Sequence, residues 1–303
     1  MKFGKRFTYR KQPVQIGVIF PQTEMDQTPD DISRYATGVE EMGYKHLLAF
    51  DHVVGGSIDA YPELQGRYTS SSLFHEVFVL FGYLAAITNS LELASGVIIL
   101  PQRQTTLVAK QAAAIDVLSE GRLRLGIGIG WNKIEYQALN ENFSNRARRF
   151  EEQIELMRRL WERQVIDFEG EFHTVKQAGI HPLPPRKAIP MWIGASAEPA
   201  VRRAARMVDG FTSTTPVGPQ LEILIGWLQD ELARNDRSWD DFGFECRITL
   251  ANSGEDDWKR EFSYWQEVGA SHVLINSRDG GLVTVDEHLD ALERALRVLE
   301  PLR

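Results

Sequence analysis

The chain contains almost no cysteine and no long apolar run. Its 303 residues include one cysteine, Cys246, so no disulfide can form within the chain, and nothing indicates an oxidising compartment. No stretch approaches the roughly 18 consecutive apolar residues of a membrane-spanning helix. The basic start of the chain is followed by VQIGVIF, which is short for a signal peptide, ends at Pro21 and lacks a small-residue cleavage site. We therefore expect a cytoplasmic protein in which residues 1–13 form a solvated basic tail.

Basic residues are fewer than acidic ones. The sequence has 34 Lys+Arg against 42 Asp+Glu, a formal net charge of -8, which argues against binding to nucleic acid or to an anionic membrane surface. The histidines lack the H-E-x-x-H spacing of metal hydrolases, and no G-x-S-x-G nucleophile elbow occurs. The sequence therefore predicts no metal site and no nucleic-acid or membrane partner.

Short apolar runs alternate with amphipathic helical stretches along the chain. In SNRARRFEEQIELMRRLWE, Phe150, Ile154 and Met157 recur at the spacing of one helix face. The apolar runs are residues 14–20, 46–50, 91–100, 122–129, 190–195, 210–215, 244–250 and 272–277. This alternation indicates parallel βαβ units, and eight of them in a chain of this length predict an α/β fold of the (β/α)8 TIM-barrel type. An open doubly wound sheet is the alternative.

One segment interrupts the alternation. Residues 165–190 lie between the fourth helical stretch and the fifth strand, and they contain the alternating pattern DFEGEFHTV around Gly170. Such alternation around a glycine predicts a small hairpin. No linker rich in proline, glycine or serine divides the chain, so we predict a single domain over residues 1–303 with this insertion.

Three glycines alternate in the fourth apolar run, GRLRLGIGIGWNK. The spacing of Gly126, Gly128 and Gly130 differs from the G-x-G-x-x-G of a dinucleotide site, because the third glycine comes one residue early. Alternate residues of a strand share one face. The small residues therefore predict room for bulky neighbours inside the barrel, or for a flat ligand at its upper end.

Functional side chains of a barrel follow the C-terminal ends of its strands. Asp51 and His52 end the second run as a polar pair that suits a base or proton carrier, or that caps the following loop. Ser95 and Gly96 interrupt the third run, which indicates a bulge for close ligand approach or plain packing. In WIGASAEPA we expect Ser196 to be the N-cap of a helix whose free N–H groups bind phosphate, with capping alone as the alternative.

In their joint order these motifs resemble the bacterial luciferase-like monooxygenase family, and within it the branch that uses the deazaflavin coenzyme F420. The resemblance rests on DHV, on the block LASGVIILPQRQTTLVAKQAAAIDVLSEGRLRLGIGIGWNKIEYQAL, and on RRFEEQIELMRRLW, FEGEFHTV and IPMWIGASAEPAVRRAAR. It implies a (β/α)8 barrel that binds F420, or alternatively FMN, at the C-terminal ends of the strands.

The resemblance also implies roles for the residues after the second and third strands. Asp51 and His52 would lie near the cofactor ring, with His52 as the proton donor or acceptor. Ser95, Gly96 and Val97 would form a bulge behind the ring, with a cis peptide at Gly96–Val97.

Two further groups of residues would bind the cofactor by the same resemblance. Gly130, Trp131 and Asn132 would border its ring and side chain. Its phosphate would be held by Gly194, Ala195 and Ser196. Trp131 stands where relatives that oxidise sugar phosphates have a glutamate, so we expect an apolar or planar substrate instead.

The implied activity is hydride transfer between reduced F420 and a small organic substrate. The alternative is a two-component monooxygenase that uses FMNH2 from a separate reductase, and the third possibility is a non-catalytic flavin-binding or partner subunit. The anionic tail of F420 calls for basic groups. The candidates are Arg103, Lys110, Lys133 and Arg202. By analogy with the family we expect a homo-oligomer, a dimer or larger.

Overall fold

Nine strands of the described chain form one closed parallel sheet. The computed structural model describes residues 7, 9 and 13–302. The strands are β1 (Gln15–Ile19), β2 (His46–Ala49), β3 (Glu92–Ser95), β4 (Ile98–Ile99), β5 (Leu123–Gly128), β8 (Met191–Gly194), β9 (Gly210–Thr212), β10 (Gly243–Thr249) and β11 (His272–Asn276). Their order is β3-β2-β1-β11-β10-β9-β8-β5-β4, and an additional pairing of β3 with β5 closes the barrel.

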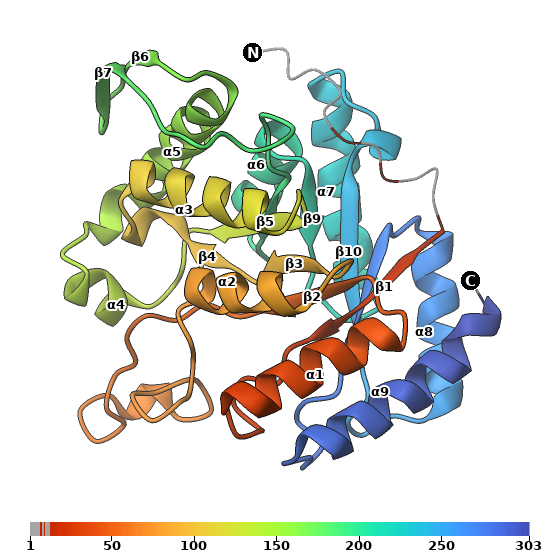
Figure 1. Ribbon diagram of the computed structural model, residues 1–303. Coiled ribbons are helices and arrows are strands. Elements are labelled where there is room, and N and C mark those ends of the chain that lie inside the picture. The colour runs from red at the N-terminus through yellow and green to blue at the C-terminus, as the bar shows by residue number, and fades with distance from the viewer. Residues whose placement is uncertain (1–6, 8, 10–12, 303) are drawn as a thin grey trace.

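The strand β4 resumes the course of β3 after an interruption of two residues, so the two occupy one of eight positions around the barrel (Figure 1). Each of the eight apolar runs of the sequence coincides with a barrel strand to within a few residues or, for residues 91–100, with β3 and β4. The predicted TIM barrel is therefore confirmed, and the alternative of an open doubly wound sheet is wrong.

Helices follow the barrel strands and cover the outside of the sheet (Figure 1). The α-helices are α1 (Pro29–Glu41), α2 (Val77–Ile87), α3 (Thr105–Leu118), α4 (Lys133–Ala138), α5 (Arg146–Glu162), α6 (Glu198–Met207), α7 (Pro219–Arg234), α8 (Glu255–Glu267) and α9 (Val285–Leu299). The 3-10 helices are η1 (Pro62–Leu64), η2 (Leu100–Gln102), η3 (Phe143–Asn145), η4 (Trp239–Asp241) and η5 (Glu300–Leu302). Within the described residues, no helix has the length and apolar character that crossing a membrane requires.

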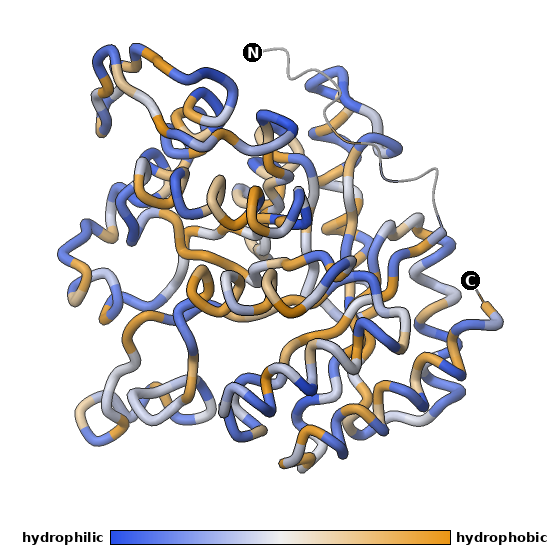
Figure 2. Tube along the Cα trace, viewed as in Figure 1, coloured by the Kyte–Doolittle hydropathy of each residue, from blue (hydrophilic) through white to orange (hydrophobic). Residues whose placement is uncertain are grey.

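Local sequence explains where these helices begin and which face they bury. Thr28 caps α1 by accepting a hydrogen bond from the Asp31 N–H (3.2 Å), and Pro29 at the first helical position needs no N–H partner. Along α5, Phe150, Ile154 and Met157 are buried, as their spacing predicts. Figure 2 shows the resulting alternation of hydrophobic and hydrophilic residues along the outer helices.

The insertion forms the predicted hairpin and packs against neighbouring helices. Its strands β6 (Ile166–Glu169) and β7 (Thr174–Ala178) pair antiparallel. Nδ1 of His173 lies 2.7 Å from Oε1 of Glu152 on α5, and its Nε2 lies 2.6 Å from Oγ1 of Thr105 on α3. The carboxylate of Glu152 also accepts hydrogen bonds from the backbone N–H groups of the hairpin turn. These contacts fix the hairpin to the outside of the barrel.

The predicted basic tail, residues 1–13, lies largely outside the described residues. Of its described residues, Tyr9 packs edge-on against Trp192, with ring centroids 5.4 Å apart, and lies 6.0 Å from the His272 ring. Nε1 of Trp192 donates a hydrogen bond to the Tyr9 hydroxyl (3.3 Å). The expectation of a solvated tail is therefore wrong at Tyr9, because its ring contacts aromatic side chains of β8 and β11.

A layer of buried charged groups fills the barrel at the level of the first strand residues. Arg124 on β5 donates to Glu92 (2.6 Å) and to Glu245 on β10 (2.7 Å), and the ring of Trp192 lies 4.3 Å from its guanidinium carbon. His46 Nε2 lies 3.0 Å from Glu245 Oε1. Burial alone would raise the pKa of the Glu245 carboxyl, but the Arg124 charge and the His46 contact hold it well below its ordinary value.

Glycines make room for the large rings of this layer. A Cβ on Gly17 would overlap the His46 ring, and a Cβ on Gly210 or Gly243 would overlap the Trp192 ring. Above the charged layer, an apolar layer follows toward the C-terminal ends of the strands. Its buried members are Ile19, Leu48, Ala94 and Leu274, with Phe50 packed against them. The two layers leave the space for a ligand at the C-terminal end.

Candidate active site

A cavity of about 380 Å³ lies at the C-terminal end of the barrel. Every one of the eight strand positions contributes to its wall. The lining residues are Ile19, Leu48, Phe50, Gly96, Val97, Trp131, Gly194, Ala195, Ser196, Thr212, Ser213, Thr214, Arg247 and Leu274. Its volume falls in the ordinary range for sites of small molecules and cofactors, and its floor is the apolar layer.

The structure brings several of the predicted cofactor residues together around this cavity. These are Gly96, Val97, Trp131, Gly194, Ala195 and Ser196. The other predicted residues lie behind or beside the wall. They are Asp51, His52, Ser95, Gly130 and Asn132. The roles implied for all of them stay predictions, and their contacts indicate what each side chain can do.

The interruption between β3 and β4 forms a bulge in the cavity wall. The Gly96–Val97 peptide bond is cis, as the resemblance implies. The Ser95 hydroxyl donates to the carbonyl oxygen of Gly126 (2.9 Å), so this side chain holds the bulge against β5. A Cβ on Gly126 would overlap the Ser95 carbonyl group, and one on Gly128 would lie 2.7 Å from Cγ2 of Val97. Both glycines therefore make room for the bulge, as one of the two interpretations of their alternation predicts.

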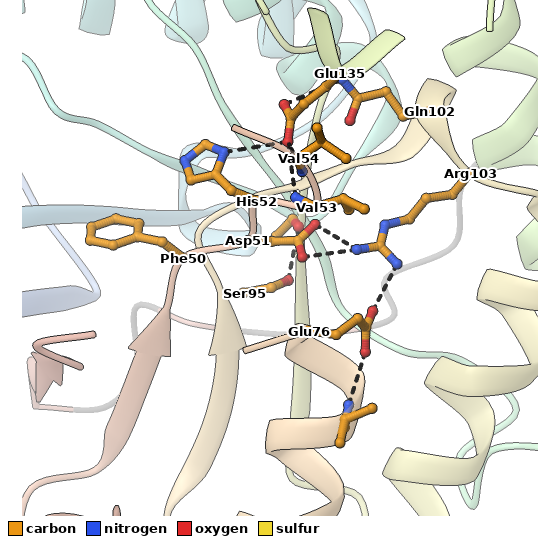
Figure 3. Close-up of polar contacts among 12 residues, drawn as sticks. Phe50, Asp51, His52, Val53, Val54, Glu76, Ser95, Gln102, Arg103 and Glu135 are labelled. Atoms are coloured by element: carbon orange, nitrogen blue, oxygen red, sulfur yellow. Dashed lines mark hydrogen bonds and ion pairs between the residues drawn. The ribbon is translucent and has the colours of Figure 1, made fainter. Parts of the chain in front are cut away.

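Asp51 belongs to a set of ion pairs around Arg103. Nη2 of Arg103 donates to both carboxylate oxygens of Asp51 (2.8 and 2.9 Å), and its Nη1 donates to Oε1 of Glu76 (2.8 Å) (Figure 3). Burial raises the pKa of the Asp51 carboxyl above its ordinary value, and the Arg103 charge opposes this shift. Because Glu76 is the N-cap of α2, these contacts connect the end of β2 to the start of that helix.

His52 lies in a group of aromatic rings beside the cavity. Its ring stacks on Tyr68, with centroids 3.4 Å apart, and meets Phe74 edge-on at 4.8 Å. Its Nδ1 lies 3.8 Å from Oε1 of Glu135 (Figure 3). Tyr68 also contacts the ring of Trp131, at 5.8 Å between centroids. Tyr68 and Trp131 thus connect His52 to the cavity wall.

A buried carboxylate, Glu135 on α4, organises the loop that carries His52. It accepts hydrogen bonds from the N–H of Val53 (2.9 Å) and from the hydroxyl of Tyr68 (2.8 Å). Burial alone would raise the pKa of the Glu135 carboxyl, but its contacts with His52, Tyr68 and Val53 hold it below the ordinary value. Asn132 is the N-cap of α4 and donates to the Tyr68 hydroxyl (2.7 Å).

The sequence interpretation missed Glu135 and Tyr68. Glu135 follows the N-cap Asn132 by three residues, a spacing that is typical of helix starts. That spacing marks the beginning of α4, but it does not indicate that the carboxylate reaches a loop 82 residues earlier in the chain. Tyr68 lies in the long connection between β2 and α2, where no periodic pattern selects it.

The predicted N-cap at Ser196 is wrong by one residue. The N-cap of α6 is Ala197, in an extended conformation and without a side-chain cap. Ser196 instead lies in the cavity wall with Gly194 and Ala195. Beside them on the cavity rim, Ser213 and Thr214 follow the neighbouring strand β9. The binding of a phosphate at this strand end stays a prediction, and the hydroxyl groups present there are suited to it.

None of the basic residues predicted to bind the cofactor tail lines the cavity. They are Arg103, Lys110, Lys133 and Arg202. Besides the ion pairs of Arg103, Lys110 donates to the carbonyl oxygen of His181, and Arg202 pairs with Glu198 on α6. The guanidinium group that does line the cavity is Arg247 of β10, which the sequence interpretation missed.

The chain matches the model of the luciferase-like monooxygenase family over residues 12–293. It therefore belongs to this family. The relatives include an uncharacterised protein of Mycobacterium tuberculosis (strain ATCC 25618 / H37Rv), 32% identical over 58% of this chain and 60% of that protein. They also include the F420-dependent glucose-6-phosphate dehydrogenase of Microbacterium testaceum, 28% identical over 80% of this chain and 66% of the enzyme. The chain thus matches somewhat less than two thirds of these relatives' own lengths.

Solved structures of low sequence identity share the fold. The monooxygenase RslO1 from Streptomyces bottropensis superposes with a TM-score of 0.75 at 17% identity, covering 95% of this chain and 99% of that one. An F420-dependent secondary alcohol dehydrogenase, in complex with an F420-acetone adduct, gives a TM-score of 0.77 at 15% identity and the same coverage. At these identities the likeness supports the barrel fold alone.

Replacing Glu135 by Gln tests the contacts of this carboxylate. We expect the free energy of unfolding at pH 7 to fall by about 1–3 kcal/mol. In the wild type, the Val53 N–H and the Tyr68 hydroxyl donate to different oxygens of the carboxylate, whereas the amide of Gln offers only one acceptor oxygen. The lowered pKa means that the carboxylate stabilises the fold above the unfolded value of about 4.3 and that this contribution is lost as the pH falls below it. Urea unfolding at pH 7 and pH 4 should therefore show a smaller difference between the two proteins at pH 4.

The control for this experiment is Glu155→Gln, which removes an exposed pair with Arg159 on α5. Exposed pairs of this kind contribute about 0.3–0.5 kcal/mol, so this variant should resemble the wild type. An equal loss of stability in the two variants would contradict the role given to Glu135.

Proposed function

We propose that this protein is an oxidoreductase that binds coenzyme F420 in the cavity and transfers hydride between the reduced cofactor and a small organic substrate. The observation that carries the proposal is the shape of the cavity wall. The Ser95–Val97 bulge forms one side of a space whose floor is apolar, and Gly96 and Gly194 add no side chain to it. A flat, largely apolar ring system fits such a wall.

The polar groups at the rim support the same assignment. The segment from Gly194 to Ser196 and the residues Ser213 and Thr214 present hydroxyl and backbone groups at the strand ends, where a phosphate-bearing side chain would leave the cavity. Two of the relatives are F420-dependent glucose-6-phosphate dehydrogenases by name, from Microbacterium testaceum and Mycobacterium avium. When bound, the deazaflavin would supply or accept the hydride.

The chain itself would orient the ring, exclude water and carry a proton. The apolar layer below the cavity excludes water from its floor. We propose His52 as the proton carrier, because Tyr68 and Phe74 fix its ring and Glu135 faces its Nδ1, which leaves Nε2 for exchange. Asp51 has no free oxygen beside Arg103, so its part is to position this loop.

The cavity wall carries an aromatic residue, Trp131, where a sugar-phosphate enzyme would need an acid. Trp131 is 46% exposed at the cavity wall, and the guanidinium carbon of Arg67 lies 4.4 Å from its ring centroid. The indole ring presents a flat apolar face, and its N–H is not acidic enough to transfer a proton at neutral pH. We therefore propose a substrate with an apolar or planar body.

A second candidate function is a monooxygenase that uses FMNH2 from a separate reductase. The observation that favours it is the match to the luciferase-like monooxygenase family over residues 12–293. Both cofactors present a flat tricyclic ring, so the shape of the wall supports either of them, and the F420-dependent relatives favour F420.

Titration with each cofactor separates these functions. We expect the purified protein to quench or shift the fluorescence of F420 with a micromolar Kd and to bind FMN at least about 10-fold more weakly, a difference of about 1.4 kcal/mol. Micromolar binding of FMN alone would favour the monooxygenase. Binding of neither would favour a non-catalytic subunit and would contradict the proposed function.

Replacing His52 by Ala tests the proton carrier. Turnover of F420H2 with an accepted substrate should fall by about 100-fold or more, the usual contribution of a general acid or base, while the Kd for F420 changes little. His181→Ala is the matched control, because this exposed histidine lies in the insertion away from the cavity. An unchanged turnover of the His52 variant would remove this residue from the mechanism.

We also propose that the protein forms a homo-oligomer through α2 and α3. These neighbouring helices expose large apolar side chains, with Val79 at 72%, Leu107 at 56% and Leu118 at 65%. Exposed apolar groups gathered on adjacent elements are typical of association surfaces.

Light scattering tests the oligomer. The wild type should have at least twice the mass of the 34.4 kDa chain, and the double variant Val79→Asp, Leu107→Asp should have the mass of one chain, because charges at such a surface oppose association. A monomeric wild type would contradict the proposal, and so would an unchanged mass of a correctly folded variant.

A further inference from the structure

The Arg247 side chain is a charged group inside the cavity that forms no hydrogen bond or ion pair with the described chain. It lies on β10 and lines the cavity above the apolar layer. Among the described residues, no hydrogen bond or ion pair of its guanidinium occurs, although a half-buried charge of this kind is costly without a partner. Burial lowers the pKa of Arg247, and Asp279 opposes this shift from a greater distance than an ion pair.

The nearest carboxylate on the same strand, that of Glu245, already has other partners. Glu245 precedes Arg247 by two residues and so shares its face of β10. Its Oε1 accepts from Arg124 and faces His46, and its Oε2 accepts from the hydroxyl of Thr212. The carboxylate of Glu245 therefore has its partners within the charged layer below the cavity. The Arg247 guanidinium is not one of them and is available to a ligand in the cavity.

A second guanidinium group lies at the same corner. The guanidinium carbon of Arg278, just after β11, lies 5.1 Å from the ring centroid of Phe50, which lines the cavity. Its Nη2 donates to the hydroxyl of Thr23 (3.1 Å), but its Nε is buried and has no hydrogen-bond partner. The charge of Arg278 also disfavours the charge on Arg247, although less strongly than Asp279 favours it. An anion between the two guanidinium groups would offset this effect.

The position of this corner in the barrel separates it from the cofactor wall. In the sheet order, β10 and β11 lie on one side of the barrel next to β1 and β2. The bulge, Trp131 and the segment from Gly194 to Ser196 come from β3, β5 and β8, which adjoin one another on the other side. The guanidinium groups therefore face the part of the cavity that a ring placed against the bulge would leave open.

We propose that the cavity binds a substrate with one carboxylate and an apolar body, and that Arg247 binds the carboxylate with support from Arg278. A guanidinium group binds a carboxylate through two parallel hydrogen bonds. Ile19, Leu48 and Leu274 provide the apolar floor for the remainder of the molecule. The statement that this ligand is the substrate rests on the proposed function. The statement that the cavity binds an apolar carboxylate is independent of it.

A matched pair of probes tests the proposal. The probes are 3-phenylpropionate and its neutral amide, which have the same body, and binding is followed by calorimetry with the purified full-length protein. The wild type should bind the carboxylate about 10-fold or more tightly than the amide, as a hydrogen bond to a charged group implies. Arg247→Met should abolish this preference, and Arg247→Lys should retain part of it, because an ammonium keeps the charge without the paired geometry.

Arg159→Met is the control, since this residue lies on α5 and pairs with Glu155. It should keep the preference of the wild type. Equal binding of the two probes by the wild type would overturn the proposal, and so would an intact preference in Arg247→Met with a wild-type circular dichroism spectrum. Tighter binding of phenylphosphonate than of the carboxylate would overturn the choice of a carboxylate.

A titration of the same variants with F420 separates this proposal from the proposed function. Arg247→Met should bind F420 with an affinity close to that of the wild type. A loss of F420 affinity of about 10-fold or more in this variant, together with an unchanged carboxylate preference, would assign Arg247 to the cofactor and overturn the proposal. If the wild type binds the carboxylate but not F420, the proposed function fails and the carboxylate site stands.

Discussion

The ion pairs of the buried Arg124 with Glu92 and Glu245 determine where a ligand can bind in this barrel. A barrel of eight strands encloses just enough space for side chains, and here charged and aromatic groups take the space at the N-terminal end. Such a layer is stable only when every charge in it has a partner, because breaking one buried pair leaves an uncompensated charge. The barrel is thus closed below, and the ligand cavity begins above the next, apolar layer.

Steric constraints then shape the cavity wall. Gly126 and Gly128 leave room on β5 for the bulge between β3 and β4, and the Ser95 hydroxyl binds that bulge to the Gly126 carbonyl oxygen. The loop after β2 is held from two sides, by Arg103 at Asp51 and by Glu135 at Val53. Each of these contacts connects segments near strand ends that are distant in the chain.

The elements of the fold could be predicted from the sequence because each of them is determined by a local pattern of residues. Each apolar run marks its strand, the helix-face spacing of Phe150 and Ile154 indicates their burial, and the alternation around Gly170 indicates a hairpin. Local patterns also mark residues at the ends of strands, which is why Trp131 and the segment from Gly194 to Ser196 were found in the cavity wall.

The missed residues depend on contacts between distant parts of the chain. Tyr68 and Glu135 are 67 residues apart and meet through one hydrogen bond. Arg247 lies in an apolar strand, where a single cation carries no periodic signal, and its lack of a partner is visible only when the barrel is closed. The cap at Ser196 was misplaced by one residue because helix boundaries depend on backbone dihedral angles that residue type determines only weakly.

The net charge of the chain affects how Arg247 and Arg278 could attract an anionic ligand. With a formal charge of -8, the surface as a whole repels an anion. At physiological ionic strength, however, exposed charges are largely screened beyond about 8 Å, whereas groups in a cavity with apolar walls are screened much less. An anion at the mouth would therefore respond mainly to Arg247 and Arg278. Discrimination against neutral molecules would come from the cavity itself rather than from long-range attraction, and it would persist as the salt concentration rises.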